Sequence, residues 1–239
     1  MEFIKLYFQL KNGIKLIVRK IDLLKKIKLK LKFNSYRLNF RRIYKNNLFK
    51  GDSSISGRGS NLDQTIVLRE ELVPLLRKLD IKKLLDVPCG DFNWMRHIKF
   101  EDIEYIGGDI VKKLVKENIN SYSSKKCNFL YIDLTSSKLP EADTIFCRDC
   151  LVHLNYKQIF NALKNIKRSN IKYLMATTFS DREENIDLSS GIWRPLNLCK
   201  APFNFPEPIE LLNEKCPEGN GEWHDKCVGV WKVDDIVIK

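Results

Sequence analysis

The stretch LLDVPCGDFNW, residues 84–94, decides the fold of this chain. The apolar run at 83–87 predicts a short buried strand, and a polar loop with one glycine, Gly90, follows it at once. In an open α/β sheet, ligands bind beyond the carboxyl ends of the strands, where such loops lie. The loop therefore marks the edge of the sheet at which a binding site is expected.

Outward from this loop, strands alternate with helices along a chain of 239 residues that is 44% hydrophobic, enough for one packed α/β domain. Strands are expected at 83–87, 104–107, 128–132, 144–147, 172–177, 209–213 and 228–233, and helices at 62–79, 93–98, 111–119 and 156–167. In the first helix we expect Asp63 to act as a cap and Pro74 to disturb the middle. The order predicts right-handed βαβ units and a doubly wound, mostly parallel seven-stranded sheet, with the last two strands as an antiparallel hairpin at one edge.

Positive charge is concentrated near the N-terminus. The net charge is +12, but residues 1–50 hold 15 Lys/Arg and two acids, which is +13 and leaves −1 for the rest. The Ser/Gly-rich segment SSISGRGSN (53–61) suggests a boundary, so 1–52 is interpreted as a basic amphipathic arm and 53–239 as the domain. The arm either lies on an anionic membrane surface or a partner protein, or packs its apolar stripe on the domain.

Location and metal content follow from the same composition. No run of about 18 apolar residues spans a membrane, and lysines interrupt the N-terminal apolar residues, unlike in a signal peptide. Seven scattered cysteines are typical of reduced thiols in the cytoplasm, and none of their spacings predicts a metal site. The protein is expected in the cytoplasm, or at the inner membrane surface if the arm binds lipid.

Acidic residues follow four consecutive predicted strands. They are Asp86 and Asp91, Asp109, Asp133, and Asp149 next to Arg148. Carboxylates suit a ligand rich in hydrogen-bond donors better than a phosphate. The first loop also lacks the G-x-G-x-x-G of dinucleotide sites, so nicotinamide cofactors are excluded. Each acid taken singly is also compatible with a helix cap.

The successive motifs DVPCGDFNWM, YIGGDI, FLYIDL and IFCRDCLVHL resemble those of class I S-adenosylmethionine-dependent methyltransferases, over roughly residues 56–239. Among these enzymes the chain looks most similar to bacterial members from surface-polysaccharide gene clusters. The resemblance implies a Rossmann-like fold and S-adenosylmethionine as cofactor. The sequence departs from the family's glycine motif, with Pro88 and Phe92 at the outer glycine positions.

The resemblance also implies roles for single residues. Asp109 would take both ribose hydroxyls, Asp133 with Leu134 would face the adenine amino group, and Asp86 with the Gly90 loop would receive the methionine portion. The full cofactor set is Asp86, Pro88, Cys89, Gly90, Phe92, Trp94, Asp109, Ile110, Asp133, Leu134 and Arg148. Phe92 and Trp94 are expected to wall the pocket.

The acceptor side is expected at the end of the fourth strand. A hydroxyl acceptor needs a general base, and His153, one helical turn beyond Asp149, is the candidate. Asp149 would assist, hold the acceptor or bind a divalent metal; His153 would otherwise cap or pack the following helix. The long loop 181–206 suits a substrate lid, with Arg182, Trp193, Arg194 and Asn197 as candidate contacts, or a structural extension packed on the sheet.

These observations favour O-methylation of a sugar hydroxyl or another small-molecule acceptor. Two alternatives stay open. The chain could methylate RNA or another macromolecule through the basic arm, although the [D/N]-P-P-[Y/F] motif of nucleobase amine methylation is replaced by RDCL (148–151). It could also bind the cofactor only as a non-catalytic partner module.

Overall fold

The structure is a computed structural model that describes residues 36–238. Its helices are α2 (Tyr36–Lys45), α3 (Ile66–Lys78), α4 (Lys112–Tyr122) and α5 (Tyr156–Lys167). Its strands are β1 (Lys83–Asp86), β2 (Glu104–Asp109), β3 (Cys127–Tyr131), β4 (Thr144–Cys147), β5 (Tyr173–Phe179), β6 (Glu210–Asn213) and β7 (Lys226–Lys232). Residues 1–35, which hold most of the predicted arm, lie outside the described part, so that prediction stays open.

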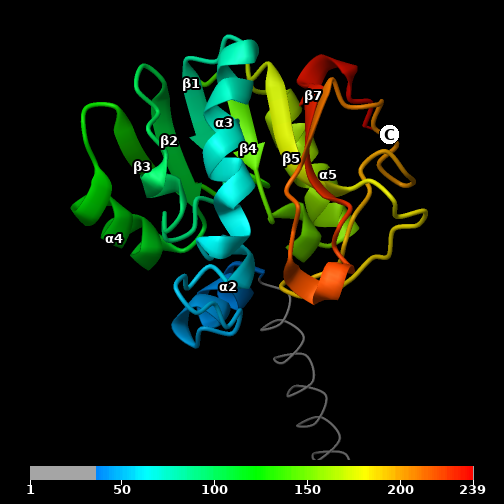
Figure 1. The fold of residues 1–239 in the computed structure, drawn as a ribbon, viewed down its shortest axis with the longest axis horizontal. Coiled ribbons are helices and arrows are strands. Elements are labelled where there is room, and N and C mark those ends of the chain that lie inside the picture. Colours follow the sequence, from blue (N-terminus) through cyan, green and yellow to red (C-terminus); the bar gives the residue numbers. More distant parts are fainter. Residues whose placement is uncertain (1–35, 239) are drawn as a thin grey trace, which may run out of the picture. The chain divides into compact units, whose positions relative to one another are not determined.

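All seven strands form one sheet in the order β3-β2-β1-β4-β5-β7-β6 (Figure 1). The first five strands pair in parallel, whereas β7 is antiparallel to both β5 and β6. The predicted sheet and its antiparallel edge hairpin are therefore confirmed. The strand order reverses between β1 and β4, and the residues following these two strands meet at this switch point.

The core lies between the sheet and its helices. α3 covers one face of the sheet (Figure 1). Its residues Leu68, Leu72 and Leu76 are spaced one turn apart and belong to the same buried cluster as Leu84 and Phe146 of the strands. In β1 and β4 the intervening residues Leu85 and Ile145 point to the other face and are fully buried. α5 begins with a capping box, in which the Asn155 side chain accepts from the Gln158 amide, and it buries its own apolar stripe.

Several local predictions about helices are corrected. The helix expected at 62–79 starts with a 3-10 turn at Asp63–Thr65 and becomes α-helical at Ile66, and Asp63 accepts from the Gln64 side chain instead of capping it. The helix expected at 93–98 is one 3-10 turn, Met95–His97. Pro74 does not interrupt α3.

The chain divides into two compact units, and the second, which contains the sheet, begins at Phe40. Ile43 in α2 is buried, and the Tyr44 hydroxyl donates to Glu117 of α4 at 2.7 Å. Part of the segment assigned to the arm thus packs within the domain unit, while the boundary of the arm stays a prediction.

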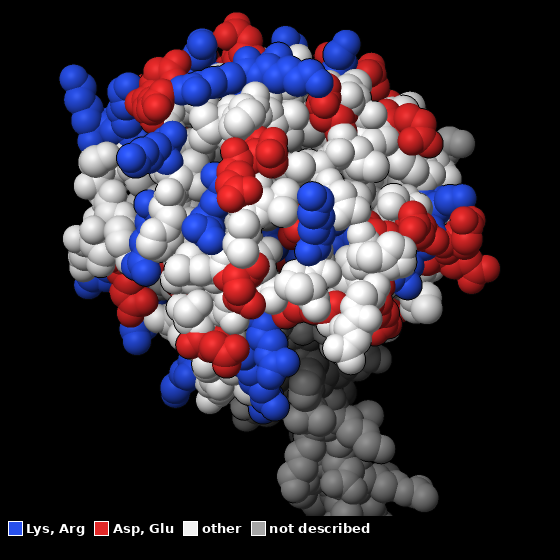
Figure 2. Space-filling model, in the orientation of Figure 1, with Lys and Arg blue, Asp and Glu red and all other residues white. Residues whose placement is uncertain are grey.

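The surface carries mixed charge. On the face shown in Figure 2, basic and acidic side chains alternate and neither sign forms a continuous patch. Within residues 36–238, no helix is both long and apolar enough to cross a bilayer.

Candidate functional site

Hydrogen bonds join the loop after β1 to the end of β2, and one of them is the Cys89 N–H donating to the Gly108 carbonyl at 2.9 Å. Gly90 has a φ of 56°, and its N–H donates to Asp109 Oδ2 at 3.2 Å. The Val111 N–H donates to Asp109 Oδ1 at 2.8 Å. Burial raises the pKa of Asp109 to about 6, against the lowering effect of these amides, so the carboxylate is mostly ionised at neutral pH. The sequence placed both residues correctly at this edge.

Asp86 lies in the same region but is largely protonated. Its carboxyl is buried and accepts the Tyr105 hydroxyl at 2.6 Å. Burial raises the pKa of Asp86 to about 8, although the hydrogen bond from Tyr105 lowers it in part. A cation placed next to this group would favour its ionised form.

Asp133 follows β3. It lies near Asp109 of the neighbouring strand β2, because the preceding residue Ile132 donates its N–H to the Asp109 carbonyl at 3.0 Å. Its Oδ1 accepts from the Thr135 N–H at 3.0 Å and from the Thr135 hydroxyl at 2.8 Å. Leu134 is buried, and its carbonyl accepts from Asn165 at 2.8 Å. Asp133 therefore orders its own turn, as in the capping alternative, while lying at the predicted strand end.

The two aromatic residues of the loop belong to the core. Phe92 has a φ of 58° and packs against Tyr105, Tyr122 and Phe129. Trp94 packs edge-on against Phe146. Both are 7% exposed, so they support the loop from beneath instead of forming an open pocket wall. Of the other residues assigned to the cofactor, Cys89 is buried, whereas Pro88 and Ile110 are partly exposed.

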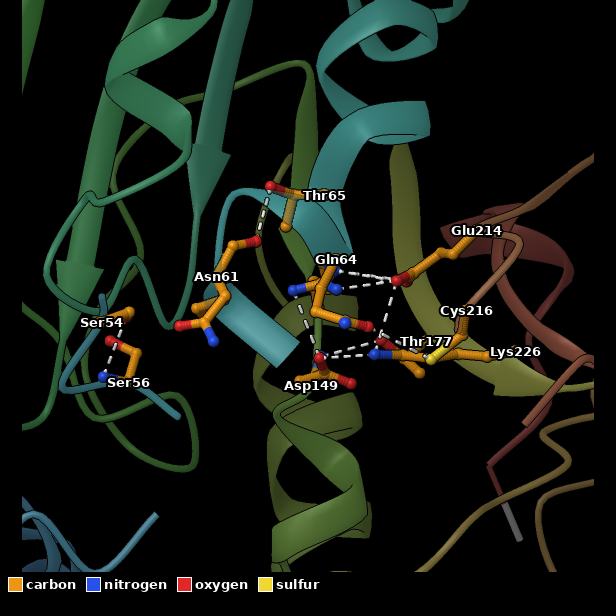
Figure 3. A network of polar contacts seen from close by, with 12 residues as sticks. Ser54, Ser56, Asn61, Gln64, Thr65, Asp149, Thr177, Glu214, Cys216 and Lys226 are labelled. Atoms are coloured by element: carbon orange, nitrogen blue, oxygen red, sulfur yellow. Dashed lines mark hydrogen bonds and ion pairs between the residues drawn. The ribbon is translucent and has the colours of Figure 1, made fainter. Parts of the chain in front are cut away.

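A largely buried group of four charges lies beyond β4 (Figure 3), in which only the Asp149 side chain is partly exposed. Arg148 donates to both oxygens of Glu214, at 2.7 to 3.3 Å, and its Nη1 lies 3.3 Å from Asp149 Oδ2. Lys226 Nζ lies 2.8 Å from Asp149 Oδ2 and 3.4 Å from Glu214 Oε2. The Arg148 guanidinium also stacks on Trp94 at 5.4 Å. Arg148, which the resemblance assigned to the cofactor, is therefore engaged in this charge group.

Asp149 and His153 are left with unused polar atoms. Among the described residues, buried Asp149 Oδ1 and His153 Nδ1 have no hydrogen-bond partner. Burial alone would raise the pKa of Asp149, but the nearby cations Lys226 and Arg148 hold this pKa well below its usual range. Burial lowers the pKa of His153 to about 4, against the attraction of Asp149, so the imidazole is neutral at physiological pH. Phe49 covers the ring with centroids 4.7 Å apart.

The loop 181–206 is held mainly by its own polar residues. Buried Arg194 donates to the carbonyls of Leu151 and Val152 at 3.1 and 2.7 Å. Asn197 donates to the carbonyls of Ser180 and Arg182 at 3.0 and 2.9 Å. These contacts fit the structural alternative for Arg194 and Asn197.

Two further candidates of this loop meet an aromatic residue of the 214–226 loop. Arg182 donates to Asp225 at 3.0 Å and lies over Trp223. Trp193, 36% exposed, packs edge-on against Trp223 with centroids 4.7 Å apart. Trp193 is thus packed against Trp223 and remains partly exposed, and its role as a substrate contact stays a prediction.

Sequence reasoning missed Glu214, Lys226, Phe49 and Tyr105. Lys226 was placed in a loop because β7 was expected to begin at Val228; a lysine inside a buried strand would have signalled a buried partner. Glu214 is 66 residues from Arg148, and no local pattern announces that pair. No group of three or more His, Cys, Asp or Glu within residues 36–238 could hold a metal ion.

Comparisons with known proteins locate the fold. No protein-family model matches the sequence, and no curated protein matches it. Among solved structures, the chain is similar to PigF with SAH, with a TM-score of 0.51 and 13% identity over 70% of this chain and 55% of that one. Human N-acetylserotonin methyltransferase in complex with SAM gives 0.48 and 10%, over 80% and 65%. The N-methyltransferase NodS from Bradyrhizobium japonicum WM9, in complex with S-adenosyl-l-homocysteine, gives 0.46 and 14%, over 57% and 72%.

The similarity to PigF concerns the fold, because the sequences are only 13% identical and this chain spans about half of PigF's length. The structure of this chain shows directly the strand order, the antiparallel hairpin and the acids at the strand ends. The chain has a Rossmann-like α/β fold with a mostly parallel seven-stranded sheet, and it shares this fold with the matched part of PigF.

Proposed function

We propose that this chain is an S-adenosylmethionine-dependent methyltransferase whose acceptor is a sugar hydroxyl in surface-polysaccharide synthesis. The observation that carries the acceptor side is the pair of unused buried atoms, Asp149 Oδ1 and His153 Nδ1. Buried polar atoms without partners are rare in proteins, and at a switch point they favour a ligand that completes their hydrogen bonds.

The cofactor side is supported by the acids at neighbouring strand ends. Asp109 is ionised and already accepts from two amides, but each carboxylate oxygen accepts two hydrogen bonds, so ribose hydroxyls could still bind it. Asp133 would face the adenine amino group. A cationic ammonium of the methionine portion beside Asp86 would lower the pKa of that carboxyl and so favour its ionised form. The donor set thus fits a cofactor rich in hydroxyl and amino groups.

When bound, S-adenosylmethionine would supply a methyl group from its positively charged sulfur to the acceptor oxygen, and the electron pair of the broken C–S bond would stay on sulfur. His153 is neutral and would accept the proton of the acceptor hydroxyl at Nδ1. The ionised Asp149 carboxylate would stabilise the imidazolium that forms. Phe49 stacks on the ring and limits the access of water.

Cofactor binding is tested by calorimetric titration of S-adenosylmethionine into the wild-type protein and Asp109→Ala. Loss of hydrogen bonds to a charged group predicts a Kd about 10- to 100-fold higher for the variant. Equal affinity for both proteins would refute the ribose assignment. Absence of binding to the wild type would refute the function.

Methyl transfer is tested by measuring S-adenosylhomocysteine release with a panel of nucleotide sugars and glycan fragments. His153→Gln should lose turnover while it keeps cofactor affinity. Turnover on RNA alone would favour the macromolecule alternative, and binding without turnover on any acceptor would favour the non-catalytic module.

We also propose a cytoplasmic protein whose N-terminal arm touches an anionic membrane or a partner protein. The support is the excess of Lys and Arg in residues 1–50. Cosedimentation with anionic but not neutral vesicles would be the expected result.

A further inference from the structure

A segment that the sequence suggests is only a boundary is firmly anchored on the Gly90 loop. We call residues 53–61 the strap. The Asp91 carboxylate accepts from the Ser54 hydroxyl at 2.8 Å, the Ile55 N–H at 2.9 Å and the Ser56 hydroxyl at 3.1 Å. The Asp91 N–H donates back to Ser56 Oγ at 3.0 Å. Ser54 is 3% exposed, which is unlike a flexible Ser/Gly linker.

Ser56 lies directly against Gly90. A Cβ atom on Gly90 would be 2.2 Å from Ser56 Oγ, so any side chain at this position would collide with the strap. The N–H of the same glycine donates to Asp109, the carboxylate proposed to bind the ribose. Ser56 therefore borders the place proposed for the ribose.

The strap continues to the acceptor side. A Cβ on Gly59 would be 3.1 Å from Asp149 Oδ2 and 3.7 Å from Lys226 Nζ. Just beyond Gly59, the Ser60 carbonyl accepts from the Asn93 side chain at 3.0 Å. Figure 3 shows the two serines at one end of this arrangement and Asp149 at the other. One short segment thus touches the residues that follow both β1 and β4.

We propose that the strap is a wall of the cofactor site, and that Ser54, Ser56 and Asp91 are positioning residues that hold it over Gly90. The inference rests on the proposed function, since it assigns the cofactor to that site. Asp91 then acts as the anchor of the strap, in addition to repelling a phosphate from this loop. The strap in turn fixes the cofactor's place relative to Asp149.

The test is titration of S-adenosylhomocysteine into the full-length wild type, Asp91→Asn, Ser54→Ala and Ser56→Ala. Asp91→Asn keeps the shape but loses the charge that three donors share, so we expect a Kd at least about tenfold higher. The serine variants should show smaller increases. Ser169→Ala is the matched control. The Ser169 hydroxyl donates to the Ile166 carbonyl just beyond α5, at the edge of the sheet opposite the strap. The Kd of this variant should therefore not change.

Hydrogen exchange separates a positioning role from a merely structural one. Addition of S-adenosylhomocysteine should slow exchange in residues 53–61 of the wild type, and less so in Ser54→Ala, whose thermal unfolding is measured in parallel. If the wild type binds the probe but the strap variants bind it equally or more tightly, the inference is overturned and the proposed function stands. If the wild type does not bind the probe, the proposed function itself fails and the inference with it.

Discussion

Replacing Lys226 with methionine removes one of two cations from the buried group of four charges. The Lys226 side chain is 6% exposed, and its Nζ lies 2.8 Å from Asp149 and 3.4 Å from Glu214. In Lys226→Met, Arg148 alone faces two carboxylates, and its Nη1 lies 3.3 Å from Asp149. Because an uncompensated buried charge remains, the free energy of unfolding should fall by about 3–5 kcal/mol.

Urea and thermal unfolding followed by circular dichroism would measure this loss. For a chain of this size, about 1 kcal/mol corresponds to about 2–4 °C, so Tm should fall by roughly 6–20 °C. Lys232→Met is the matched control, since Lys232 is exposed at the other end of β7, and its effect should stay within about 0.5 kcal/mol.

The double variant Lys226→Met/Glu214→Gln removes one charge of each sign. It leaves Arg148 with Asp149, so its cost should be smaller than the sum of the two single costs by about 0.5–3 kcal/mol. A cost for Lys226→Met no greater than that for Lys232→Met would refute the coupling of these charges, as would single costs that simply add.

Three other variants test local terms by urea unfolding. Burial raises the pKa of Asp86 to about 8, so the stability that the protonated carboxyl contributes is present at low pH and lost as pH rises through 8. Asp86→Asn should therefore gain stability relative to the wild type from pH 5 to pH 9. A difference in unfolding free energy that stays constant over this range would contradict the prediction. Burial lowers the pKa of His153 to about 4, so the unfolded chain binds a proton first and stability falls as pH drops from 6.5 to 4. His153→Gln should remove up to about 3 kcal/mol of that fall. An unchanged dependence of the unfolding free energy on pH would contradict the prediction. Asn155→Ala should lose the capping box of α5 and about 1 kcal/mol, whereas a neutral effect would show that the cap is dispensable.

The sequence by itself determined the seven strands and their order along the chain. β4 and α5 have the predicted bounds, because the apolar run and the helical period are local signals that end at clear turn residues. The predicted ends of β1, β3 and β4 are right to within one residue, whereas β2 and β5 each continue two residues further than expected. The edge where Asp109 and Asp133 lie was nevertheless predictable. The 3-10 turns at 63–65 and 95–97 were not, since a single turn and an α-helix begin with the same short pattern.

Only the tertiary structure decided which polar residues have partners. Glu214 and Lys226 meet Arg148 and Asp149 across 66 and 77 residues of sequence, and burial then makes these pairings obligatory because an unpaired charge is too costly there. Serines typical of a linker became an anchored strap once Asp91 offered a carboxylate to them. Composition sets what a segment can do locally, whereas long-range packing sets what its polar atoms contact.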